Sequence, residues 1–352
     1  MKSSKKIAIV GAGVFGSTIA LRLSSNNYHC FLYEEKKDIL LGASRVNQYR
    51  FHRGYHYPRS LKTVSQLKVT IPLFIDEYGD TVDSSFENLY GIAKDNSHVD
   101  EKTYIEFLEK CNLKYSITNK FNNLLTEKVP FIVQVEEGLI NYKRLKQTIS
   151  ERIKNQSNLN LKLNTKFTKD LLKEYDYVII CGYGTCQELL PIELINKYKY
   201  QLIEKIVITP PKELENISLV IIDGPFMCID PLLGTSYSIL GNVVNAIHST
   251  SISDKVPESF YNNNNIKLWD DISDIEKSRF KTFVNHGNEY IKFFDKSKFE
   301  YSMRGIRVIK RNVESTDERT TVLRKSGKII DVFSGKLDTC SWAANQVLKL
   351  IE

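Results

Sequence analysis

The first part of the chain alternates between short apolar runs and an amphipathic stretch. Residues 7–10 form a fully apolar, β-branched run, which is typical of a parallel strand buried on both faces. A helical pattern starts at about Val14 and gives way to a second apolar run at 30–33, which ends beside Glu34. The pattern therefore predicts a strand, a helix and a second strand in immediate succession.

Apolar periodicity predicts further elements along the chain. We expect helices over 61–80, after a Ser97 cap, after an Asn141 cap and after Lys336, and strands over 89–93, 131–135, 160–167 and 175–181. Four short strands interrupted by Pro, Gly and Asp are expected as an antiparallel sheet, at 202–209, 218–222, 226–229 and 237–244. Apolar residues at helical spacing over 269–294 predict one long helix. The chain is thus expected to be of the α/β class with a second, antiparallel part.

Three glycines between the first strand and the first helix point to chemistry. Gly11, Gly13 and Gly16 have the spacing of a dinucleotide-binding fingerprint, in which the glycines allow a tight turn, close approach to a pyrophosphate and helix–strand packing. The helix start would direct N–H groups and its positive dipole end at that phosphate. Glu34, roughly 20 residues further on, can accept hydrogen bonds from ribose hydroxyls. The unit predicts a dinucleotide site and leaves NAD and FAD open.

Length, charge and cysteine content narrow the class of protein. At 352 residues the chain is too long for one simple core, so we expect two domains, or one nucleotide domain with a large insertion. The formal charge of +7 suits an anionic cofactor or substrate and does not favour nucleic acid. No apolar run is long enough to cross a bilayer, and no signal peptide is recognisable. The six cysteines show no C-x-x-C and no metal-ligand spacing, so we expect reduced thiols, a cytoplasmic location and no metal.

Residues 42–62 are dense in hydrogen-bonding and aromatic side chains and have no amphipathic period. His52 and His56 stand here among three tyrosines and four arginines. A packed structural histidine would usually stand alone among apolar neighbours. The composition therefore favours a loop that lines a ligand site over an ordinary surface loop.

This loop resembles the flavin-proximal loop of the D-amino-acid oxidase/glycine oxidase superfamily of FAD-dependent oxidoreductases. In that family an Ala-Ser pair, here Ala43 and Ser44, and a nearby Asn, here Asn47, follow the ribose-binding acid. The run from 47 to 62, with its His-x-Gly and its Ser-Leu-Lys, is most similar to the 2-hydroxyglutarate dehydrogenase branch. His56 stands where that branch has the first tyrosine of a pair.

The middle of the chain continues the resemblance. The order of three segments is similar to the second half of the family's FAD domain. They are an acid-Gly-Leu-Ile turn at 137–140, the helix after it, and a strand that ends in Gly-x-Gly, at Gly182 and Gly184. Glycines there would let the backbone approach the cofactor closely. Phe167 falls at the family's adenine-contacting position.

Two C-terminal turns complete the resemblance. Residues 305–307 resemble the Gly-x-Arg whose arginine binds the substrate carboxylate through two parallel hydrogen bonds; a structural ion pair is the alternative for Arg307. Gly335, Lys336 and Leu337 precede a helix whose N-terminus would stabilise the anionic reduced flavin. Lys336 adds to this effect or is simply solvated.

The resemblance implies a Rossmann-like FAD-binding domain with a mixed α+β substrate domain built on an antiparallel sheet. The FAD-binding domain would comprise residues 1–82, 138–195 and 300–352, and the substrate domain residues 83–137 and 196–299. The expected cofactor is FAD, held by Gly11, Gly13, Val14, Phe15, Gly16, Glu34, Glu35, Ala43, Ser44, Asn47, Phe167, Gly182, Gly184, Gly335, Lys336 and Leu337. The expected catalytic residues are His52, His56 and Arg307, and the expected substrate contacts are Tyr55, Tyr57, Arg304 and Arg307.

The implied reaction removes hydride from a C–OH or C–NH centre beside the carboxylate of a small substrate. An alcohol needs a base for its proton, for which the two histidines titrate in the right range, whereas a neutral amine needs none. Three alternatives stay open: a flavoenzyme for a larger anionic sugar or a carrier-bound intermediate in polysaccharide or secondary-metabolite biosynthesis, an NAD-dependent dehydrogenase, and a non-catalytic flavin-binding module. The electron acceptor and the oligomeric state are open too.

Overall fold

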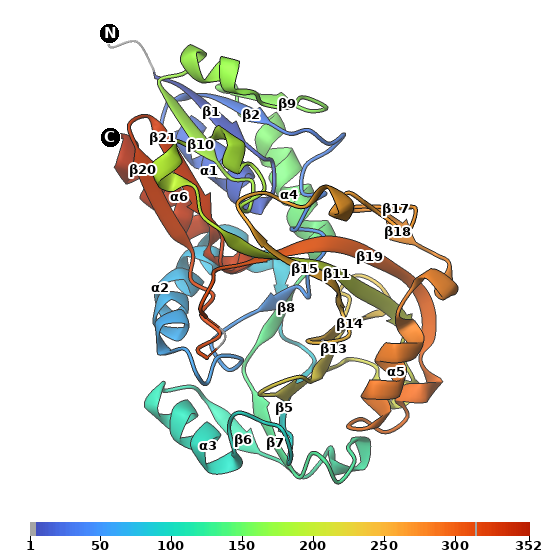
Figure 1. Cartoon of the computed structure of the whole chain (residues 1–352). Helices are drawn as coiled ribbons and strands as arrows, with labels where there is room; N and C mark the ends of the chain where they lie inside the picture. Colours follow the sequence, from blue (N-terminus) through green and yellow to red (C-terminus); the bar gives the residue numbers. More distant parts are fainter. Residues whose placement is uncertain (1–4, 314) are drawn as a thin grey trace.

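The two ends of the chain build one mostly parallel sheet, drawn at the top of Figure 1 together with both termini. The computed structural model describes residues 5–313 and 315–352. The strand order of this first sheet is β20 (Val322–Ser326), β21 (Ile329–Phe333), β10 (Tyr177–Ile180), β1 (Lys6–Val10), β2 (His29–Tyr33) and β9 (Leu159–Lys162). The strands from β21 to β9 run parallel, and β20 is antiparallel to β21. The expected strand–helix–strand start is confirmed.

Both faces of the first sheet are covered, as the apolar run of β1 predicts. Ile7 and Ile9 point to one face and pack in a common core with four helices, namely α1 (Val14–Ser25), α2 (Leu61–Tyr78), α4 (Tyr142–Lys154) and α6 (Cys340–Ile351). Ala8 and Val10 point to the other face, where they pack against Tyr33 and the segment 167–195. This double burial explains why β1 carries no polar residue after Lys6.

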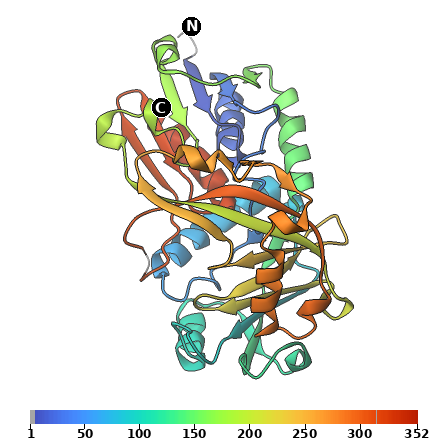
Figure 2. The ribbon, with the colours of Figure 1, turned by 45° about the vertical axis from the view of Figure 1, so that its right-hand side comes forward.

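The second sheet is larger and mostly antiparallel. Its strand order is β18 (Asp271–Ile272), β19 (Lys298–Ile309), β11 (Tyr198–Thr209), β14 (Ser238–Asn242), β13 (Met227–Pro231), β12 (Ile217–Ile222), β5 (Glu87–Ile92), β7 (Phe131–Val135) and β6 (Tyr115–Ile117), and β15 (Ile247–Ser253) pairs with β11. β12 and β5 form its parallel pair. Figure 2 shows β11 and β19 as long ribbons that cross the middle of the molecule below the first sheet.

Smaller elements complete the chain. A three-stranded sheet joins β3 (Arg50–Phe51), β8 (Gly138–Ile140) and β4 (Val82–Asp83), and a hairpin joins β16 (Asn262–Asn263) and β17 (Ile266–Lys267). The remaining helices, α3 (Glu101–Lys110) and α5 (Phe280–Asn288), lie on the second sheet's side of the molecule (Figure 1). The fold is thus the expected α/β architecture with two sheets. The proposed division into an FAD part and a substrate part stays a prediction, and β19 pairs within the second sheet.

Two expected helix features are wrong. Residues 269–294 do not form one helix, because residues 271–272 pair with β19 and the α-helix begins only at Phe280. Ile272 and Phe283, which suggested a helical stripe, are both buried, but from a strand and a helix respectively. The cap of α3 is Asp100, which accepts a hydrogen bond from the Thr103 amide, and not Ser97. No helix in the described ranges combines the length and apolarity needed to cross a bilayer.

Substitution of the confirmed α4 cap gives a test of this fold. The Asn141 side chain accepts a hydrogen bond from the Arg144 amide at 3.0 Å. We expect Asn141→Ala to lower the free energy of unfolding by about 1 kcal/mol, because an amide at the helix start loses its acceptor. Urea unfolding followed by circular dichroism measures the change. Gln147→Ala, at an exposed position within α4, is the control; an equal effect of both substitutions would contradict the cap.

Candidate active site

A cavity of about 810 Å³ opens at the carboxyl ends of the parallel strands. It is lined by residues that end or follow four strands of the first sheet, namely Val10, Glu34, Cys181 and Ser334. The opposite wall comes from the second sheet, including Ile203 of β11 and Arg307 of β19. Ligands of open α/β sheets bind at this edge, so the cavity is the candidate site.

Most residues expected at the site lie around this one cavity. They are Gly11, Gly13, Val14, Phe15, Glu34, Glu35, Ala43, Ser44, Asn47, His52, His56, Tyr57, Phe167, Gly182, Arg307, Gly335, Lys336 and Leu337. Four others, Gly16, Tyr55, Gly184 and Arg304, do not line it. The structure therefore brings segments together that are more than 300 residues apart in the sequence.

The glycine loop has the conformation that its spacing requires. Gly11 has a φ of 97°, in the region that favours glycine. A Cβ on Gly16 would lie 1.9 Å from the Gly11 carbonyl oxygen, so Gly16 allows α1 to pack against the loop without lining the cavity. The N-cap of α1 is Gly13, which offers no side-chain cap, and Ser44 Oγ accepts from the Val14 amide at 3.0 Å. Apart from the Val14 amide, which Ser44 accepts, the start of α1 faces the cavity that Gly13, Val14 and Phe15 line, as an anion site needs.

Glu34 is held in place by two backbone amides. Its Oε2 accepts from the Ala12 amide at 2.9 Å, and its Oε1 accepts from the Lys36 amide at 3.0 Å. A carboxylate offers about four acceptor positions, so lone pairs remain for ribose hydroxyls. Phe167 is buried nearby, with its ring edge-on to Tyr33 at a centroid distance of 5.0 Å. These residues form the acidic and aromatic end of the cavity.

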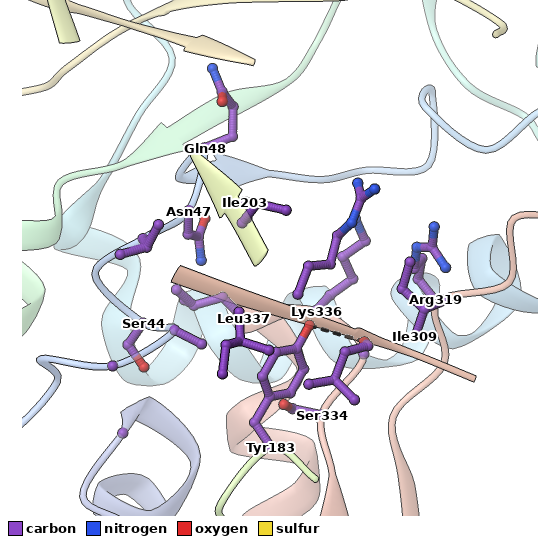
Figure 3. A pocket seen from close by; sticks show the side chains of 18 of the residues that line it. Ser44, Asn47, Gln48, Tyr183, Ile203, Ile309, Arg319, Ser334, Lys336 and Leu337 are labelled. Carbon is purple, nitrogen blue, oxygen red and sulfur yellow. Dashed lines mark hydrogen bonds between the residues drawn. The ribbon is translucent and has the colours of Figure 1, made fainter. Parts of the chain in front are cut away.

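The middle of the cavity is drawn in Figure 3. Ser44, Asn47 and Leu337 lie on one side, and Ile309 and Arg319 on the other. Tyr183 OH donates to the Val308 carbonyl at 3.2 Å, which ties the loop after β10 to β19.

Two of the C-terminal residues at the cavity are constrained by close neighbours. Gly335 lines the cavity and also lies against the backbone of another segment. A Cβ on Gly335 would lie 2.0 Å from the Arg319 carbonyl oxygen, so this position requires glycine. Lys336 Nζ lies 4.4 Å from the centre of the Tyr57 ring. Burial lowers the pKa of Lys336 and raises that of Asp338, which lies close enough for the two charges to interact.

Arg307 carries a positive charge that no acid of the described chain pairs with. Its Nε donates to Gln201 Oε1 at 2.8 Å, and its two terminal nitrogens make no hydrogen bond to a described residue. Burial, and then the nearby charge of Arg319, lower its pKa to about 10, so the guanidinium stays charged at neutral pH. A half-buried cation without an anionic partner is unfavourable, and a bound anion would relieve it. For the ion-pair alternative, no described acid lies within ion-pair distance of Arg307, although the charge of Asp317 acts on it from further away.

His52 and His56 lie next to each other on the cavity wall, with ring centres 5.6 Å apart. Burial, and then the Lys336 charge, lower the pKa of His52 to about 4. Burial, and then His52, lower the pKa of His56 as well. Both imidazoles are therefore neutral at pH 7 and able to accept a proton. Tyr57 packs edge-on against both rings.

A buried ion network lies directly behind His52. Arg50 Nη2 donates to Glu137 Oε2 at 2.9 Å, and Arg50 Nη1 pairs with Asp230 and donates to Ser218 Oγ at 2.8 Å. Burial raises the pKa of Glu137, but Arg50 and His52 outweigh it and hold that pKa well below its usual range. Both carboxylates are wholly enclosed, and the Arg50 guanidinium lies between them as their shared cation.

Three expected contacts have other roles in the structure. Tyr55 OH donates to the Lys114 carbonyl at 2.6 Å, inside the core of the second sheet. Arg304 Nη1 donates to the Asn263 carbonyl at 2.9 Å and so holds the β16–β17 hairpin. Gly184 makes room for β11 and β19, because a Cβ there would meet Tyr198 and Val308. None of the three faces the cavity.

Several cavity residues were not expected from the sequence. Lys205 lines the cavity and donates to Gln48 Oε1 at 2.7 Å, and Arg319 lines it beside its partner Asp317. A charged pair, Glu204–Lys205, inside an otherwise apolar strand was the signal for Lys205. Nothing local marks Arg319, because its position depends on how residues 317–320 approach the cavity.

The observed lining fits a dinucleotide with a second ring system. The start of α1 suits a pyrophosphate, and the held carboxylate of Glu34 suits a ribose. Glycine at position 13 keeps the approach to the helix open, because a Cβ there would lie 3.2 Å from Ser44 Oγ. The cavity continues past Asn47 and Lys336 to the second sheet, which gives room beyond the nucleotide end. This continuity favours a flavin dinucleotide followed by a substrate.

The known proteins that this chain resembles are described as FAD-dependent enzymes. Residues 6–109 match the model of the DAO family, described as FAD dependent oxidoreductase. Among curated proteins, the FAD-dependent monooxygenase FPY4 of Fusarium mangiferae is 22% identical, with 98% of this chain and 91% of that protein covered. The FAD-dependent monooxygenase kojA of Aspergillus flavus is also 22% identical, with 98% and 85% covered.

Solved structures agree with the fold. The L-alpha-glycerophosphate oxidase from Mycoplasma pneumoniae, determined with FAD bound, has a TM-score of 0.74 at 12% identity, covering 99% of this chain and 95% of its own. The glycine oxidase from Geobacillus kaustophilus has a TM-score of 0.72 at 12% identity, with the same coverage. The chain is an enzyme, an FAD-dependent oxidoreductase, and the expectation of FAD over NAD is confirmed.

Glu34→Gln tests the nucleotide end of the cavity. The amide would present an N–H₂ group to one of the two backbone amides that Glu34 now accepts from, so the side chain would turn away from the ribose position. We expect FAD binding to weaken roughly 10- to 100-fold, the effect of losing hydrogen bonds to a charged group. Quenching of FAD fluorescence on titration with the apoprotein measures it. Glu174→Gln, exposed and remote from the cavity, should leave the dissociation constant unchanged; unchanged binding by Glu34→Gln would contradict the assignment.

Proposed function

We propose that this flavoenzyme oxidises a C–OH or C–NH centre beside the carboxylate of its substrate, with Arg307 as the carboxylate ligand and His52 as the proton acceptor. The single observation that carries the proposal is the Arg307 guanidinium, which lines the cavity and whose terminal nitrogens make no hydrogen bond to a described residue. The resemblance of the 43–62 loop to the 2-hydroxyglutarate dehydrogenase branch supports a carboxylate-bearing substrate and stays a prediction.

Arg307 is suited to orient a carboxylate. Its Nε is fixed by Gln201, its neighbour across the β11–β19 pair, so the plane of the guanidinium is set before a ligand enters. Two parallel N–H donors match the two oxygens of a carboxylate. Binding would hold the adjacent substrate carbon at a defined place in the cavity, which is worth several orders of magnitude in effective concentration.

The proton and the hydride leave the substrate by different routes. FAD, when bound, supplies the flavin ring that accepts the hydride and its two electrons from the substrate carbon. For a C–OH substrate, the hydroxyl proton has to leave as the carbonyl forms, and neutral His52 can accept it. His52 is preferred to His56, because Glu137 lies 3.6 Å from its Nδ1 and can stabilise the protonated ring. Lys336 adds a positive charge to the same region.

A second candidate is oxygen insertion into a larger substrate, in which one atom of O₂ enters the substrate, the other leaves as water, and an external reductant supplies two electrons through the flavin. The names of the two fungal relatives, FAD-dependent monooxygenases, favour it. The cavity supports a larger ligand, since it continues to residues 220–228 and 241–243 of the second sheet. Incorporation of ¹⁸O from labelled oxygen into the product would favour this candidate, whereas flavin reduction by substrate without oxygen favours the first.

Arg307→Met tests the carboxylate ligand. A panel of 2-hydroxy and 2-amino acids is mixed anaerobically with the FAD-loaded protein, and the loss of oxidised-flavin absorbance is followed. We expect at least one member to reduce the flavin, and Arg307→Met to raise its KM roughly 10- to 100-fold, the effect of losing charged hydrogen bonds. Arg311→Met, exposed after β19, is the control. An unchanged KM in Arg307→Met, or no reduction by any member, would refute the proposal.

The pH dependence of the reaction tests His52. A base works in its deprotonated form, so activity is present above its pKa and is lost as the pH falls through it. Burial and Lys336 lower the pKa of His52 to about 4, so kcat/KM for a 2-hydroxy acid should have no acid limb between pH 5 and pH 7. A limb near the ordinary histidine value of about 6.5 would contradict the assignment. His52→Gln should lower kcat for hydroxy acids throughout this range.

A further inference from the structure

Glu137 lies behind the His52 ring, and each of its two carboxylate oxygens accepts hydrogen bonds from different donors. Oε2 accepts from Arg50 Nη2 at 2.9 Å and from Tyr90 OH at 2.8 Å. Oε1 accepts from the Arg53 backbone amide at 3.0 Å and lies 3.6 Å from His52 Nδ1. The first three contacts fix the carboxylate, so its remaining acceptor position at Oε1 is directed at the imidazole.

The two ring nitrogens of His52 have different surroundings. Nδ1 is buried and makes no hydrogen bond to a described residue, and Glu137 Oε1 lies 3.6 Å from it. Nε2 makes no hydrogen bond to a described residue and is left for the cavity that His52 lines. An ionised carboxylate can only accept, so a bond between Glu137 and the ring requires the proton to be on Nδ1. Contacts of this kind often shorten when the ligand is bound.

We propose that Glu137 is a positioning residue for His52, which fixes the Nδ1–H tautomer and thereby leaves the Nε2 lone pair free to accept the substrate proton in the cavity. This inference deepens the proposed function and rests on its use of His52 as the proton acceptor. It gives a role to a wholly buried acid that the substrate cannot touch.

The charges around His52 support this role. Arg50 on β3 and Lys336 before α6 oppose protonation of the ring, His56 lies beside it, and Asp338 accepts from its backbone amide at 3.1 Å. Glu137 is the group that favours the protonated ring. It therefore becomes the counter-ion when His52 holds the substrate proton.

The second carboxylate on Arg50 serves as an internal comparison. Asp230 is as buried as Glu137 and pairs with the same guanidinium, but its other partner is Ser218 Oγ, at 2.6 Å. It has no contact with His52, and it does not line the cavity. Loss of Asp230 would therefore perturb the ion network without changing which nitrogen of His52 carries the proton.

Glu137→Gln provides the test, because the amide has one oxygen and one N–H₂ group of nearly the same shape. Arg50 and Tyr90 both donate to the Oε2 position, so the oxygen should stay there and the N–H₂ group should face His52. Nδ1 would then have to accept, and its proton would move to Nε2. We expect kcat for a 2-hydroxy acid to fall at least 100-fold with KM within threefold, because the equivalent carboxylate-to-amide change behind a catalytic histidine costs about 10⁴-fold.

The direct readout is the tautomer of His52 in ¹⁵N-histidine NMR of the FAD-loaded protein, assigned with His52→Asn. We expect Nδ1–H in the wild type and in Asp230→Asn, and Nε2–H in Glu137→Gln. Nε2–H in the wild type overturns the proposal, even if no variant folds. An unchanged tautomer in Glu137→Gln, or the same change in Asp230→Asn, also overturns it. A changed tautomer with unaltered kcat would support the positioning and instead refute His52 as the proton acceptor.

Discussion

One guanidinium enclosed between two carboxylates joins the 42–62 loop to the large antiparallel sheet. Arg50 belongs to the short β3 beside the first sheet, whereas Asp230 and the Tyr90 that assists Glu137 belong to strands of the second sheet. Removing one partner of such a buried set leaves an uncompensated charge, at a cost of roughly 3–5 kcal/mol. The position of the 42–62 loop between the sheets therefore depends on this network. The position of His52 depends on it too, because His52 follows Arg50 by two residues.

The same arrangement produces one continuous cavity from two different kinds of surface. The carboxyl edge of a parallel sheet supplies backbone amides, a helix start and the held carboxylate of Glu34, which together suit the nucleotide end of FAD. The antiparallel sheet supplies Ile203 and Lys205 from β11 and Arg307 from near the end of β19. Arg307 forms no ion pair with a described acid, so its buried charge would be stabilised by a bound anion, and this links the architecture to the proposed substrate.

The sequence predicted the nucleotide end well because its chemistry is local. The glycine spacing, the helix start and Glu34 all follow within about 30 residues, and each is set by backbone geometry that neighbouring residues dictate. The far end depends on contacts between distant segments, which no local pattern reports. Residues 271–272 pair with β19 rather than extend α5, and Tyr55 and Arg304 turn into the core. Glu137 was noticed only as part of a turn, because its partners come from two distant segments, Arg50 and Arg53 from one and Tyr90 from the other.

The most direct test is whether a simple carboxylate that cannot be oxidised enters the cavity beside the flavin. Propionate can be titrated into the FAD-loaded protein while the absorption spectrum of the oxidised flavin is recorded. If Arg307 receives a carboxylate next to the cofactor, the spectrum should change saturably, and the change should be lost in a variant without the guanidinium. A spectrum unaffected by propionate in the wild type, or affected equally in that variant, would contradict a carboxylate site at Arg307.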